Sequence, residues 1–383
     1  MRHQTQVALI KRIFDLMERE ATDLAPAVET NPVRAYTDPA QLALEQENLF
    51  RGLPLLVALS GQIPNPGDYL TETVAGLPVL AVRGDDARVR AFLNVCRHRG
   101  APVAEGCGAK RRFTCPYHGW SYDRDGRLAS VPQAHWFDRL DKGSHGLVPL
   151  PVEERDGLIW LRAARDGAGL DLDAHLAGVD ADFASFGLAG YVPYATRTFR
   201  RRMNWKIVID TFLESYHLPI LHRGSVDPIF LSNRLPLDFF GRHWRAILAR
   251  RSIVELRTRP ERDWDILPYT AVIYVLFPNT VFLIQLDHVE IWRVYPVAGD
   301  VDHCDVHFTF MVPELPTNAG ARRHWRSNWE LAIHTVETED FQLGEKIQRG
   351  FHSGAQEVVT YGRHEPALGH FHRTVRREIG LED

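Results

Sequence analysis

Hydrophobic and polar residues follow different periods in different parts of the chain. Between residues 6 and 20, apolar side chains recur every three or four positions, which predicts an amphipathic helix. Residues 24–45 are rich in Pro and Ala, show no period and are expected to be irregular. Further along, short apolar runs at 77–82 and 89–95 flank Gly84-Asp85-Asp86, which predicts two strands joined by a hairpin turn.

The second half of the chain combines helical periods with alternating ones. Residues 304–312, for example, alternate apolar and polar side chains as a half-buried strand does. Strands are predicted here over 271–277, 281–286, 288–295 and 304–312, and helices over 204–217 and about 320–350. The pattern therefore predicts an α+β fold, in which a small all-β domain precedes a domain with an antiparallel sheet and long helices.

Changes of pattern divide the chain into three parts. Residues 1–45 are expected to form a helical arm that packs on the second domain. Residues 46–163 form the β-rich domain, and Leu158–Leu161 is its last strand. The Gly-, Asp- and Ala-rich segment 164–184 is typical of a linker, and the second domain takes residues 164–383.

Composition narrows the classes of function. Of the 383 residues, 45% are hydrophobic and 25% charged, which is typical of a folded globular protein. The net charge of −4 gives no reason to expect a nucleic-acid partner, and four cysteines are too few for a disulfide scaffold. The sequence shows no signal-peptide core and no apolar stretch of about 20 residues. We therefore expect no membrane partner and a soluble cytoplasmic protein with reduced thiols.

Two short Cys/His motifs lie within the β-rich domain. Cys96 and His98 form a C-x-H pair, and Cys115 and His118 form a C-x2-H pair. Two thiolates and two imidazoles suit either a tetrahedral zinc ion or a Rieske [2Fe–2S] cluster, in which the thiolates hold one iron and the imidazoles the other. Zinc motifs usually place Cys with Cys, whereas Cys and His alternate here. The pattern favours the cluster, with zinc as the alternative.

A second group of candidate ligands lies in the second domain. On the first helix predicted there, Asp210, Glu214 and His217 share one face at positions i, i+4 and i+7. Pro219 must break or kink this helix, so the chain can bring His222 beside His217 as a metal-binding pair. The alternative is that both histidines are satisfied core residues.

The third ligand of such a site is expected to be a distant carboxylate. Asp340 occupies a position in the apolar stripe of the last predicted helix, where an ionised carboxylate is costly unless it is paired or bound to metal. The stripe consists of Trp329, Ile333, Val336, Asp340, Leu343 and Ile347. Glu337, Glu339 and Glu345 fall off it and are expected to be solvated. Two His and one Asp would make the facial triad of non-haem Fe(II) oxygenases, which leaves positions open for O2. An Asp at a sheltered helix edge is the alternative.

Both groups of motifs resemble those of the Rieske non-haem iron ring-hydroxylating oxygenases, in the family of their alpha (terminal oxygenase) subunits. Residues 94–100 and 115–128 resemble the Rieske domain, and 204–206 with 214–222 resemble the mononuclear-iron motif. Residues 336–350 resemble the segment that carries the third iron ligand. The resemblance covers most of the chain, and both sets of motifs stand in the family's order.

The resemblance implies a fold, two cofactors and their ligands. The fold would be a Rieske domain followed by a helix-grip, START-like catalytic domain. A [2Fe–2S] Rieske cluster would bind Cys96, His98, Cys115 and His118, and a mononuclear non-haem Fe(II) would bind His217, His222 and Asp340.

The resemblance also implies partners. A flavoprotein reductase, directly or through a ferredoxin, would supply electrons from NAD(P)H. The chain would form a homotrimer in which the cluster of one subunit lies beside the iron of the next. Glu214 would then bridge His217 to His118 of the neighbour, and Tyr117 would either add a hydrogen bond at this junction or serve as a packed aromatic. Glu214, and Asp210 one turn before it, are the candidate catalytic carboxylates.

The substrate stays open at this point. Hydroxylation and demethylation of an aromatic or small organic compound would use the same iron ligands. Glu214 stands where many members have Asp, as it does in members that act on carnitine- or betaine-like amines, so a quaternary-amine monooxygenase is the alternative. Ser215 departs from the Cys that this subgroup often has. Candidates for the apolar and aromatic pocket wall are Leu218, Ile220, Phe230, Tyr274, Phe277, Phe282 and Leu283.

Two functions of other classes compete with the oxygenase. A Rieske electron carrier would not need the residues after the linker or their His/His/Asp set. A zinc-stapled binding protein would hold a ligand without chemistry and would be colourless and free of iron.

Overall fold

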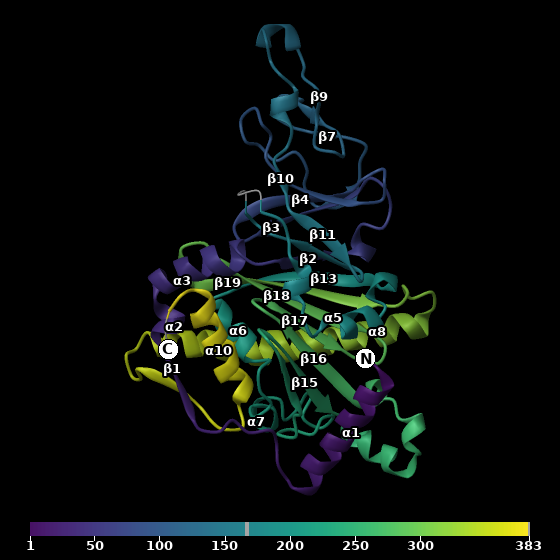
Figure 1. Ribbon diagram of the computed structural model, residues 1–383, viewed down its shortest axis with the longest axis vertical. Coiled ribbons are helices and arrows are strands. Elements are labelled where there is room, and N and C mark those ends of the chain that lie inside the picture. The colour runs from purple at the N-terminus through teal and green to yellow at the C-terminus, as the bar shows by residue number, and fades with distance from the viewer. Residues whose placement is uncertain (165–167, 382–383) are drawn as a thin grey trace. The chain divides into compact units, whose positions relative to one another are not determined.

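The computed structural model describes residues 1–164 and 168–381, which fold into two compact units (Figure 1). The smaller unit comprises Phe50–His175 and Gly187–Gly190. The larger unit comprises Met1–Leu49, Leu176–Phe186 and Tyr191–Asp383.

The unit bounds differ in detail from the expected domains. The first 49 residues belong to the larger unit. The expected linker, 164–184, runs from the smaller unit into the larger one, and residues 165–167 within it lie outside the described part of the chain.

Short antiparallel strands build the smaller unit. They are β2 (Leu55–Leu59), β3 (Asp68–Val74), β4 (Leu77–Arg83), β5 (Val89–Leu93), β6 (Cys107–Ala109), β7 (Phe113–Thr114), β8 (Ser121–Tyr122), β9 (Leu128–Ser130), β10 (Pro149–Leu150), β11 (Val152–Arg155) and β12 (Leu158–Leu161). Three sheets result, with the orders β10-β5-β4-β3-β6, β11-β12-β2 and β7-β8-β9. The predicted hairpin is present as β4 and β5, and Leu158–Leu161 is a strand as predicted. The short helices of this unit are η2 (Ser60–Gln62), η3 (Ala134–Phe137), η4 (Gly143–His145), α4 (Leu172–His175) and η5 (Leu188–Gly190).

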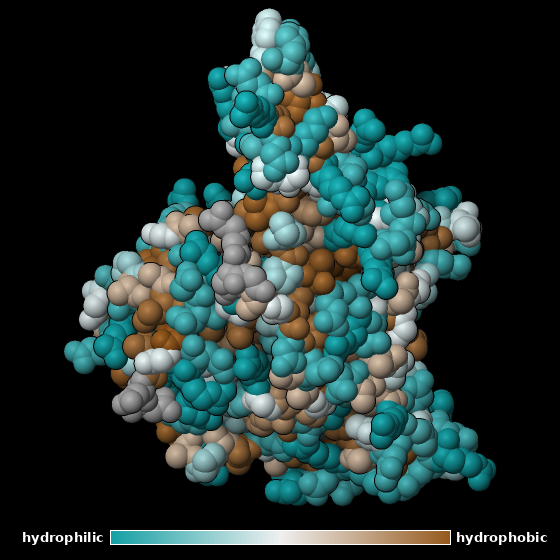
Figure 2. All heavy atoms as spheres, turned by 45° about the horizontal axis from the view of Figure 1, so that its top comes forward, coloured by the Kyte–Doolittle hydropathy of each residue, from teal (hydrophilic) through white to brown (hydrophobic). Residues whose placement is uncertain are grey.

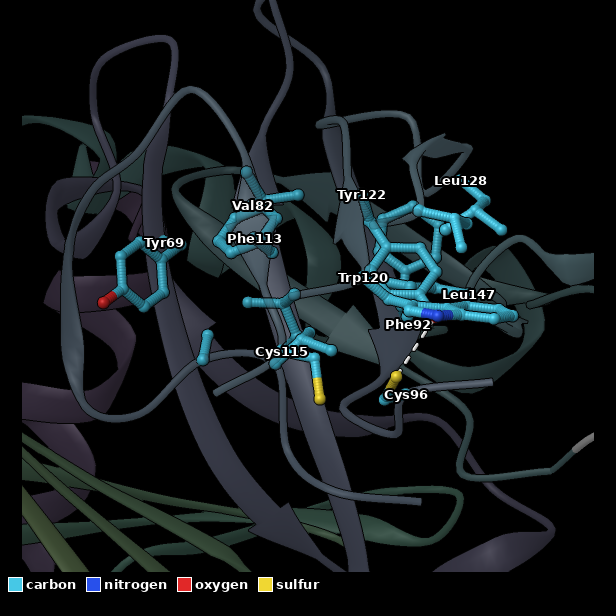
Figure 3. Packing of buried hydrophobic residues seen from close by; sticks show 14 residues of the cluster. Tyr69, Val82, Phe92, Cys96, Phe113, Cys115, Trp120, Tyr122, Leu128 and Leu147 are labelled. Carbon is cyan, nitrogen blue, oxygen red and sulfur yellow. Dashed lines mark hydrogen bonds between the residues drawn. The ribbon is translucent and has the colours of Figure 1, made fainter. Parts of the chain in front are cut away.

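An aromatic core lies under the Cys/His loops of the smaller unit. Phe113, Trp120 and Tyr122 are its large buried side chains, and Cys96 and Cys115 belong to it at 2% exposure each. Figure 3 shows both sulfur atoms at the same edge of this core. Close packing therefore holds both thiols in place before any ligand binds.

A single seven-stranded sheet forms the centre of the larger unit (Figure 1). Its strands are β13 (Val192–Arg201), β14 (Leu237–Phe240), β15 (His243–Ala249), β16 (Thr270–Leu276), β17 (Thr280–Ile284), β18 (Val289–Val297) and β19 (Asp300–Val312). All neighbours are antiparallel, in the order β13-β19-β18-β17-β16-β15-β14. The four predicted strands are therefore confirmed, and so is the α+β class.

Helices and helical turns surround this sheet. They are α1 (His3–Glu18), α2 (Arg34–Thr37), α3 (Pro39–Glu45), η1 (Gln46–Arg51), α5 (Asp180–Ser185), α6 (Trp205–Asp210), α7 (Leu218–Leu221), η6 (Arg251–Thr258), η7 (Glu261–Asp263), η8 (Leu267–Tyr269), α8 (Ala319–Ile333), η9 (His334–Asp340), α9 (Phe341–Phe351) and α10 (Pro366–Glu378). The amphipathic helix predicted over 6–20 is confirmed as α1, and α6 packs against β18 and β19.

The helix predicted over about 320–350 is present, but it is not one regular α-helix. Between α8 and α9 the chain forms η9, a π-helix, whose wider turn shifts the faces of the helix that follows. Leu343 and Ile347 were predicted on the same buried stripe as Asp340, and they are instead 41% and 40% exposed. Within the stripe, Val336 and Asp340 are therefore buried, whereas Trp329 and Ile333 are half-buried.

The expectation of irregular structure over 24–45 is wrong. The strand β1 (Glu29–Pro32) pairs antiparallel with β20 (Val358–Tyr361), far along the chain, so no local pattern could show it. The start of α3, in contrast, can be recognised from the local sequence. The Asp38 carboxylate accepts the N–H of Ala40 at 2.8 Å, and Pro39 lies in the first turn.

No helix in the described part of the chain is long and apolar enough to cross a membrane. The face in Figure 2 mixes hydrophilic residues with smaller hydrophobic areas.

Candidate metal centres and active site

The two Cys/His loops of the smaller unit have the same backbone hydrogen bonds. In each, the Cys N–H donates to the carbonyl five residues later, and a Gly N–H donates back to the Cys carbonyl. These distances are 2.8 and 2.9 Å for Cys96 and Gly100, and 2.8 and 3.0 Å for Cys115 and Gly119. Both glycines have a positive φ, +83° and +72°, which side chains rarely adopt. The loops are therefore equivalent, although His follows Cys by two positions in one and by three in the other.

The two imidazoles of these loops lie next to each other. The rings of His98 and His118 are 4.5 Å apart between centroids, and His98 also stacks on Trp120 at 5.0 Å. The Nδ1 atoms of both histidines are buried and have no hydrogen-bond partner in the described part of the chain. Burial, with the charges of His118 and Arg99, lowers the pKa of His98 and so favours the neutral form that binds metals. Two orphaned imidazole nitrogens near two buried thiols fit a bound metal cluster.

The spacing of these ligands fits two metal ions better than one. A single tetrahedral zinc ion would need all four ligand atoms within about 4 Å of one another. Among the described residues, the one group of three or more His, Cys, Asp or Glu with ligand atoms within 4.8 Å is His217, His222 and Asp340. The Cys and His pairs of the smaller unit therefore do not form one compact mononuclear site.

Tyr122 is a contact of the cluster loops that the sequence analysis missed. Its hydroxyl oxygen accepts the backbone N–H of Arg97 at 2.9 Å and lies 3.4 Å from the Cys96 sulfur. Because a backbone N–H can only donate, the Tyr122 proton points to the sulfur. Burial and this sulfur contact raise the pKa of Tyr122, so the hydroxyl stays protonated. Hydrogen bonds to ligand sulfurs are one of the factors that set the potential of an iron–sulfur cluster.

In the larger unit, Asn204, Trp205 and Lys206 anchor α6 rather than bind a ligand. The Asn204 side chain accepts the N–H of Lys206 at 3.1 Å and caps the helix. The ammonium of Lys206 contacts both oxygens of Glu45 at 2.6 and 2.7 Å, and the Trp205 indole donates to the same carboxylate at 2.8 Å. Lys206 and Glu45 are fully buried, so breaking the pair would leave a costly lone charge. This contact ties α6 to α3 and sets where the following segment begins.

The helix predicted to reach His217 ends at Asp210. The Glu214 carboxylate accepts the backbone N–H groups of Tyr216 and His217, the latter at 3.1 Å, and so competes with helical hydrogen bonding. The short helix α7 starts after His217, with Pro219 in its first turn, where no N–H is needed. The prediction that Asp210, Glu214 and His217 share one helix face is therefore wrong.

The structure brings His217, His222 and Asp340 together. The Nε2 atoms of His217 and His222 are 3.1 Å apart. The Asp340 Oδ1 atom lies 3.1 Å from His222 Nε2 and 3.8 Å from His217 Nε2. This oxygen is buried and has no hydrogen-bond partner in the described part of the chain.

Two further carboxylates hold the outer nitrogens of the histidines. His217 Nδ1 contacts Glu214, and His222 Nδ1 lies 2.7 Å from Glu339 Oε2. Glu339 also accepts from Ser225 at 2.7 Å. Glu339 was expected to be solvated, and that prediction is wrong, because the π-helical turn of η9 places Glu339 and Asp340 on two sides of His222. A carboxylate on the outer nitrogen fixes the tautomer and orientation of a metal-binding imidazole.

This arrangement needs a cation. Ionised carboxylates only accept, so the Nδ1 atoms of His217 and His222 donate, and their Nε2 atoms carry lone pairs. Together with Asp340, three acceptors then converge within 3.8 Å. Burial lowers the pKa of His222, but the neighbouring carboxylates of Asp340 and Glu339 outweigh that effect and leave the pKa above its usual value. A proton or a metal ion must therefore occupy the space between these atoms, and a mononuclear iron fits it.

Asp210, the other predicted catalytic carboxylate, lies in a separate network. It accepts from the Tyr36 hydroxyl at 2.6 Å and from His372 Nε2 at 2.9 Å. Tyr36 also contacts the Tyr361 hydroxyl at 3.0 Å. Burial and the charge of Asp210 raise the pKa of Tyr36, which therefore stays a donor. Within the described residues Asp210 has no hydrogen bond to either of the two converging histidines, but it lines a second pocket together with Glu214 and His217.

A cavity of about 180 Å³ opens beside the three converging side chains. One water takes about 10–15 Å³ by the same measure, so the cavity holds on the order of a dozen non-hydrogen atoms. Its apolar wall includes Phe212, Leu218, Phe230, Leu248, Ile273, Leu283 and Leu331. Polar side chains in the wall include Ser215, Arg250, Gln285, His288, Glu290 and Asn328.

Three of the seven predicted pocket residues line this cavity: Leu218, Phe230 and Leu283. The prediction is wrong for Tyr274 and Phe282, which are paired across β16 and β17 and point to the opposite face of the sheet from Leu283. Both pack there against Phe183, with ring centroids 5.1 and 5.0 Å away.

The remaining two predicted pocket residues also lie elsewhere. Phe277 is buried, and its ring centroid lies 5.9 Å from that of Phe371. Ile220 on α7 is 84% exposed. The strand period showed that residues alternate, but it did not show which of the two faces met the cavity.

Comparisons with known protein families agree with this geometry. Residues 54–141 match the Rieske [2Fe-2S] domain, and residues 188–380 match the catalytic domain of the ring hydroxylating alpha subunit. The chain belongs to the Rieske non-haem iron oxygenases, as an alpha subunit. It is therefore an oxidoreductase whose cofactors are a [2Fe–2S] cluster and a mononuclear non-haem iron.

Relatives with curated descriptions are monooxygenases. The chain is 35% identical over 349 residues to the chloroplastic choline monooxygenase of Spinacia oleracea, which covers 90% of this chain and 76% of that protein. It is 27% identical to the carnitine monooxygenase oxygenase subunit of Acinetobacter baumannii, over 85% of each chain. A match at 35% identity to the glycine betaine monooxygenase oxygenase subunit of Chromohalobacter salexigens spans 49% of this chain and only 41% of that protein.

Solved structures show the same fold. The quaternary ammonium Rieske monooxygenase CntA in complex with L-carnitine aligns with a TM-score of 0.79 at 23% identity, over 93% of this chain and 96% of that one. Naphthalene 1,2-dioxygenase with bound indole aligns with a TM-score of 0.71 at 19% identity, over 94% and 93%. At such identities these structures establish the fold and not the substrate.

Proposed function

We propose that this alpha subunit is the oxygenase component of a monooxygenase that acts on a small quaternary ammonium compound. The single observation that carries the oxygenase chemistry is the convergence of His217, His222 and Asp340 at a closed-in cavity. In the proposed arrangement these three residues hold the mononuclear iron, and Cys96, His98, Cys115 and His118 hold the cluster.

The smaller unit would then be the cluster domain, close to the expected range 46–163. The larger unit would be the catalytic domain, with residues 1–45 packed on it. When bound, the cluster supplies electrons one at a time and the iron supplies open positions for O2.

The residues around the iron ligands have distinct tasks in this proposal. Glu214 and Glu339 hold His217 and His222 by their outer nitrogens, so that both Nε2 atoms face Asp340. The apolar wall near Leu218 excludes water from the substrate.

The substrate class rests on three lines of support. The relatives named above are monooxygenases of choline, carnitine and glycine betaine. The Glu214 side chain stands where amine-oxidising members of the family have Glu. The cavity is small, and it combines aromatic walls with the buried carboxylate of Glu290, both of which suit an onium group. An aromatic substrate, the first expectation from the sequence, has no such support from the relatives.

The substrate class is tested by direct product analysis. The purified protein is reduced chemically without oxygen and mixed with a pool of quaternary amines or a pool of aromatic acids and ethers, and O2 is then admitted. We expect products that have gained one oxygen or lost a methyl group from the amine pool alone. Asp340→Ala, carried through the same steps, should give none. Products from the aromatic pool alone would contradict the proposal.

The second part of the proposal concerns assembly and electron supply. We propose a homotrimer that receives electrons from NAD(P)H through a flavoprotein reductase, directly or through a ferredoxin. Inter-subunit electron transfer is described for CntA. Here a second pocket of about 220 Å³ includes Glu214 and His217 in its wall together with the half-exposed Leu343 and Ile347, and so offers an apolar surface at the iron site. Tyr117, 3.8 Å from the His118 ring, is likewise exposed.

In this assembly Glu214 of one protomer would accept a hydrogen bond from His118 of the next. Co-expressing Cys96→Ser, which lacks a cluster ligand, with Asp340→Ala, which lacks an iron ligand, tests it. Each variant alone should be inactive, and the mixed assembly should regain a substantial fraction of wild-type turnover. Continued inactivity of mixed trimers, shown to have formed by native mass spectrometry, would argue that electrons stay within one chain.

A further inference from the structure

The cavity wall contains one guanidinium group. Arg250 directly follows β15, and its backbone N–H donates to the Tyr269 carbonyl at 2.7 Å, which fixes the start of its side chain. The guanidinium carbon lies 5.3 Å from the centre of the Phe230 ring. Arg250 is the only Arg or Lys among the residues that line the cavity. The wall therefore has a single permanent positive charge, and it is held in place.

Within the described residues this charge forms no salt bridge, although the negative charge of Asp287 acts on it. The one hydrogen bond of the guanidinium to a protein group joins Nη2 to Gln285 Oε1 at 2.7 Å. Burial lowers the pKa of Arg250, and the negative charge of Asp287 offsets that effect only in part. Arg245, on the same strand, instead pairs with Asp182 at 2.5 Å and with Asp238 at 2.7 Å. Arg250 thus keeps most of its donors free in a partly dehydrated site.

Gln285 separates Arg250 from the nearest carboxylate of the wall. Its Nε2 donates to Glu290 Oε1 at 3.0 Å, while its Oε1 accepts from Arg250. A guanidinium only donates and a carboxylate only accepts, so the amide has one orientation. Glu290 also accepts from Trp292 at 3.3 Å and lies 3.6 Å from His288 Nε2, so it has hydrogen-bond and electrostatic partners other than Arg250. The guanidinium therefore has hydrogen-bond donors left for a group that enters the cavity.

Arg250, Gln285 and Glu290 lie where neighbouring strands of the sheet begin or end, all at the same end of those strands. Arg250 and Gln285 follow the carboxyl ends of β15 and β17, and Glu290 lies at the amino end of β18. Because these strands are antiparallel neighbours through β16, those ends meet at the same edge. The backbone of the sheet thus positions the guanidinium, and a ligand need not order it.

We propose that Arg250 binds the carboxylate of the substrate, so that this site selects quaternary ammonium compounds that also bear a carboxylate over those that bear a hydroxyl. The inference deepens the function proposed above and rests on it. Arg binds a carboxylate through paired, charge-assisted hydrogen bonds, which are strong where water is excluded. A carboxylate fixed at Arg250 would also determine which carbon beside the nitrogen faces the three converging ligands.

Binding measurements test this directly without turnover. Isothermal titration calorimetry of the purified holoprotein without O2 compares γ-butyrobetaine and glycine betaine with choline, and adds benzoate as a carboxylate without an ammonium group. We expect at least one of the two betaines to bind about tenfold or more tighter than choline. Arg250→Met should weaken that betaine by about 10- to 100-fold and leave choline within about threefold.

Two variants control this experiment. Arg251→Met removes the next guanidinium, which is exposed and lies 3.9 Å from Asp227, and it should change nothing. Gln285→Glu keeps Arg250 but gives it a carboxylate partner, and it should weaken the betaine as Arg250→Met does. An unchanged cluster absorption spectrum shows that each variant is folded and loaded.

The outcomes separate the two proposals. Equal binding of choline and the betaines, or a betaine affinity that Arg250→Met leaves unchanged, would overturn the role of Arg250 while the quaternary-amine function stands. Equal loss of betaine and choline in Arg250→Met would also overturn it, because the residue would then serve the cavity in general. Arg250-dependent binding of benzoate without binding of any amine would overturn the quaternary-amine function and leave Arg250 as a carboxylate site. A wild-type protein that binds none of the four compounds would contradict both.

Discussion

The two candidate metal sites differ in how the chain builds them. In the smaller unit, two loops with the same hydrogen bonds each supply one Cys and one His, and the Nδ1 atoms of His98 and His118 have no hydrogen-bond partner among the described residues. In the larger unit, His217 and His222 come from one short segment and Asp340 from a segment far along the chain, and carboxylates hold both outer nitrogens. The first site has four protein donors for two irons, whereas the second has three donors beside a cavity. This difference suits a site that passes electrons and a site that admits O2 and substrate.

The largest expected effect separates the two sites by metal content. His217→Ala should lose the mononuclear iron and all turnover while the cluster spectrum stays intact, because the two sites share no ligand. His118→Ala should lose the cluster and keep the mononuclear iron. Iron analysis with visible absorption measures both. Loss of both centres in either variant, in protein whose circular dichroism is unchanged, would show that the sites depend on each other.

The next effect concerns the carboxylates that exist only at the second site. Glu339→Gln should lower iron affinity by about 10- to 100-fold, since the amide cannot hold His222 as a carboxylate does. Glu345→Gln on the neighbouring helix is the control and should bind iron normally. Competition with a ferrous chelator measures the affinity, and an unchanged affinity in Glu339→Gln would remove the role of the outer carboxylate.

Glu214→Gln addresses the other outer carboxylate. We expect both metals to stay bound and turnover to fall by about 100-fold, because Glu214 contacts His217 and lies at the surface proposed for the neighbouring cluster. Stopped-flow oxidation of the reduced cluster, measured with substrate and O2, should slow by the same factor. Normal cluster oxidation with normal metal content in Glu214→Gln would contradict the bridging role of Glu214.

Acid should also distinguish the two sites. The metal-free pKa of His222 lies above 6.5, so a proton competes with iron as the pH falls through that raised value. The pKa of His98 lies below 6.5, so its imidazole stays neutral to lower pH. Dialysis from about pH 8 to about pH 5.5 should therefore remove the mononuclear iron first. Loss of the cluster before the iron would contradict this order.

The smallest effect tests how α9 packs beside the second site. A Cβ added at Gly344 would meet the Met203 sulfur at 2.5 Å and Ile207 at 3.2 Å, so Gly344→Ala should cost about 1–3 kcal/mol of stability. Gly350→Ala in the same helix meets nothing within 4 Å and should be neutral or stabilising by up to about 1 kcal/mol. Thermal unfolding compares the two. Equal stability of both variants would mean that α6 and α9 are not closely packed.

Sequence reasoning succeeded where the chemistry is local. The Cys/His loops need only a few consecutive residues and a glycine with positive φ, so their pattern is visible at Cys96–Gly100 and Cys115–Gly119. The three iron-ligand candidates were also found, because Asp340 broke an apolar stripe and the histidines stood close together. Both cases depend on residue type more than on exact backbone shape.

Reasoning from periodicity failed where a side chain or a distant segment overrides it. The helix α6 ends at Asp210, and the Glu214 carboxylate bonds to the backbone of the segment that follows, so Glu214 and His217 do not share a helix face with Asp210, which contacts Tyr36. The π-turn of η9 moved Glu339 onto His222, and no α-helical period predicts that contact. Arg250 was missed because its proposed role depends on the lack of a salt bridge within the described residues, which only the folded chain shows.

The most direct test of the account is electron paramagnetic resonance of the reduced protein exposed to nitric oxide without O2. A site fully ligated by protein should not bind nitric oxide, whereas an iron with open positions should. We expect two signals, one from the reduced cluster and one from a nitric oxide complex of high-spin iron. His217→Ala should abolish only the second, and His118→Ala should abolish only the first. A wild-type protein without the nitric oxide signal, although its iron content accounts for both sites, would contradict the central claim that the second site is open for chemistry.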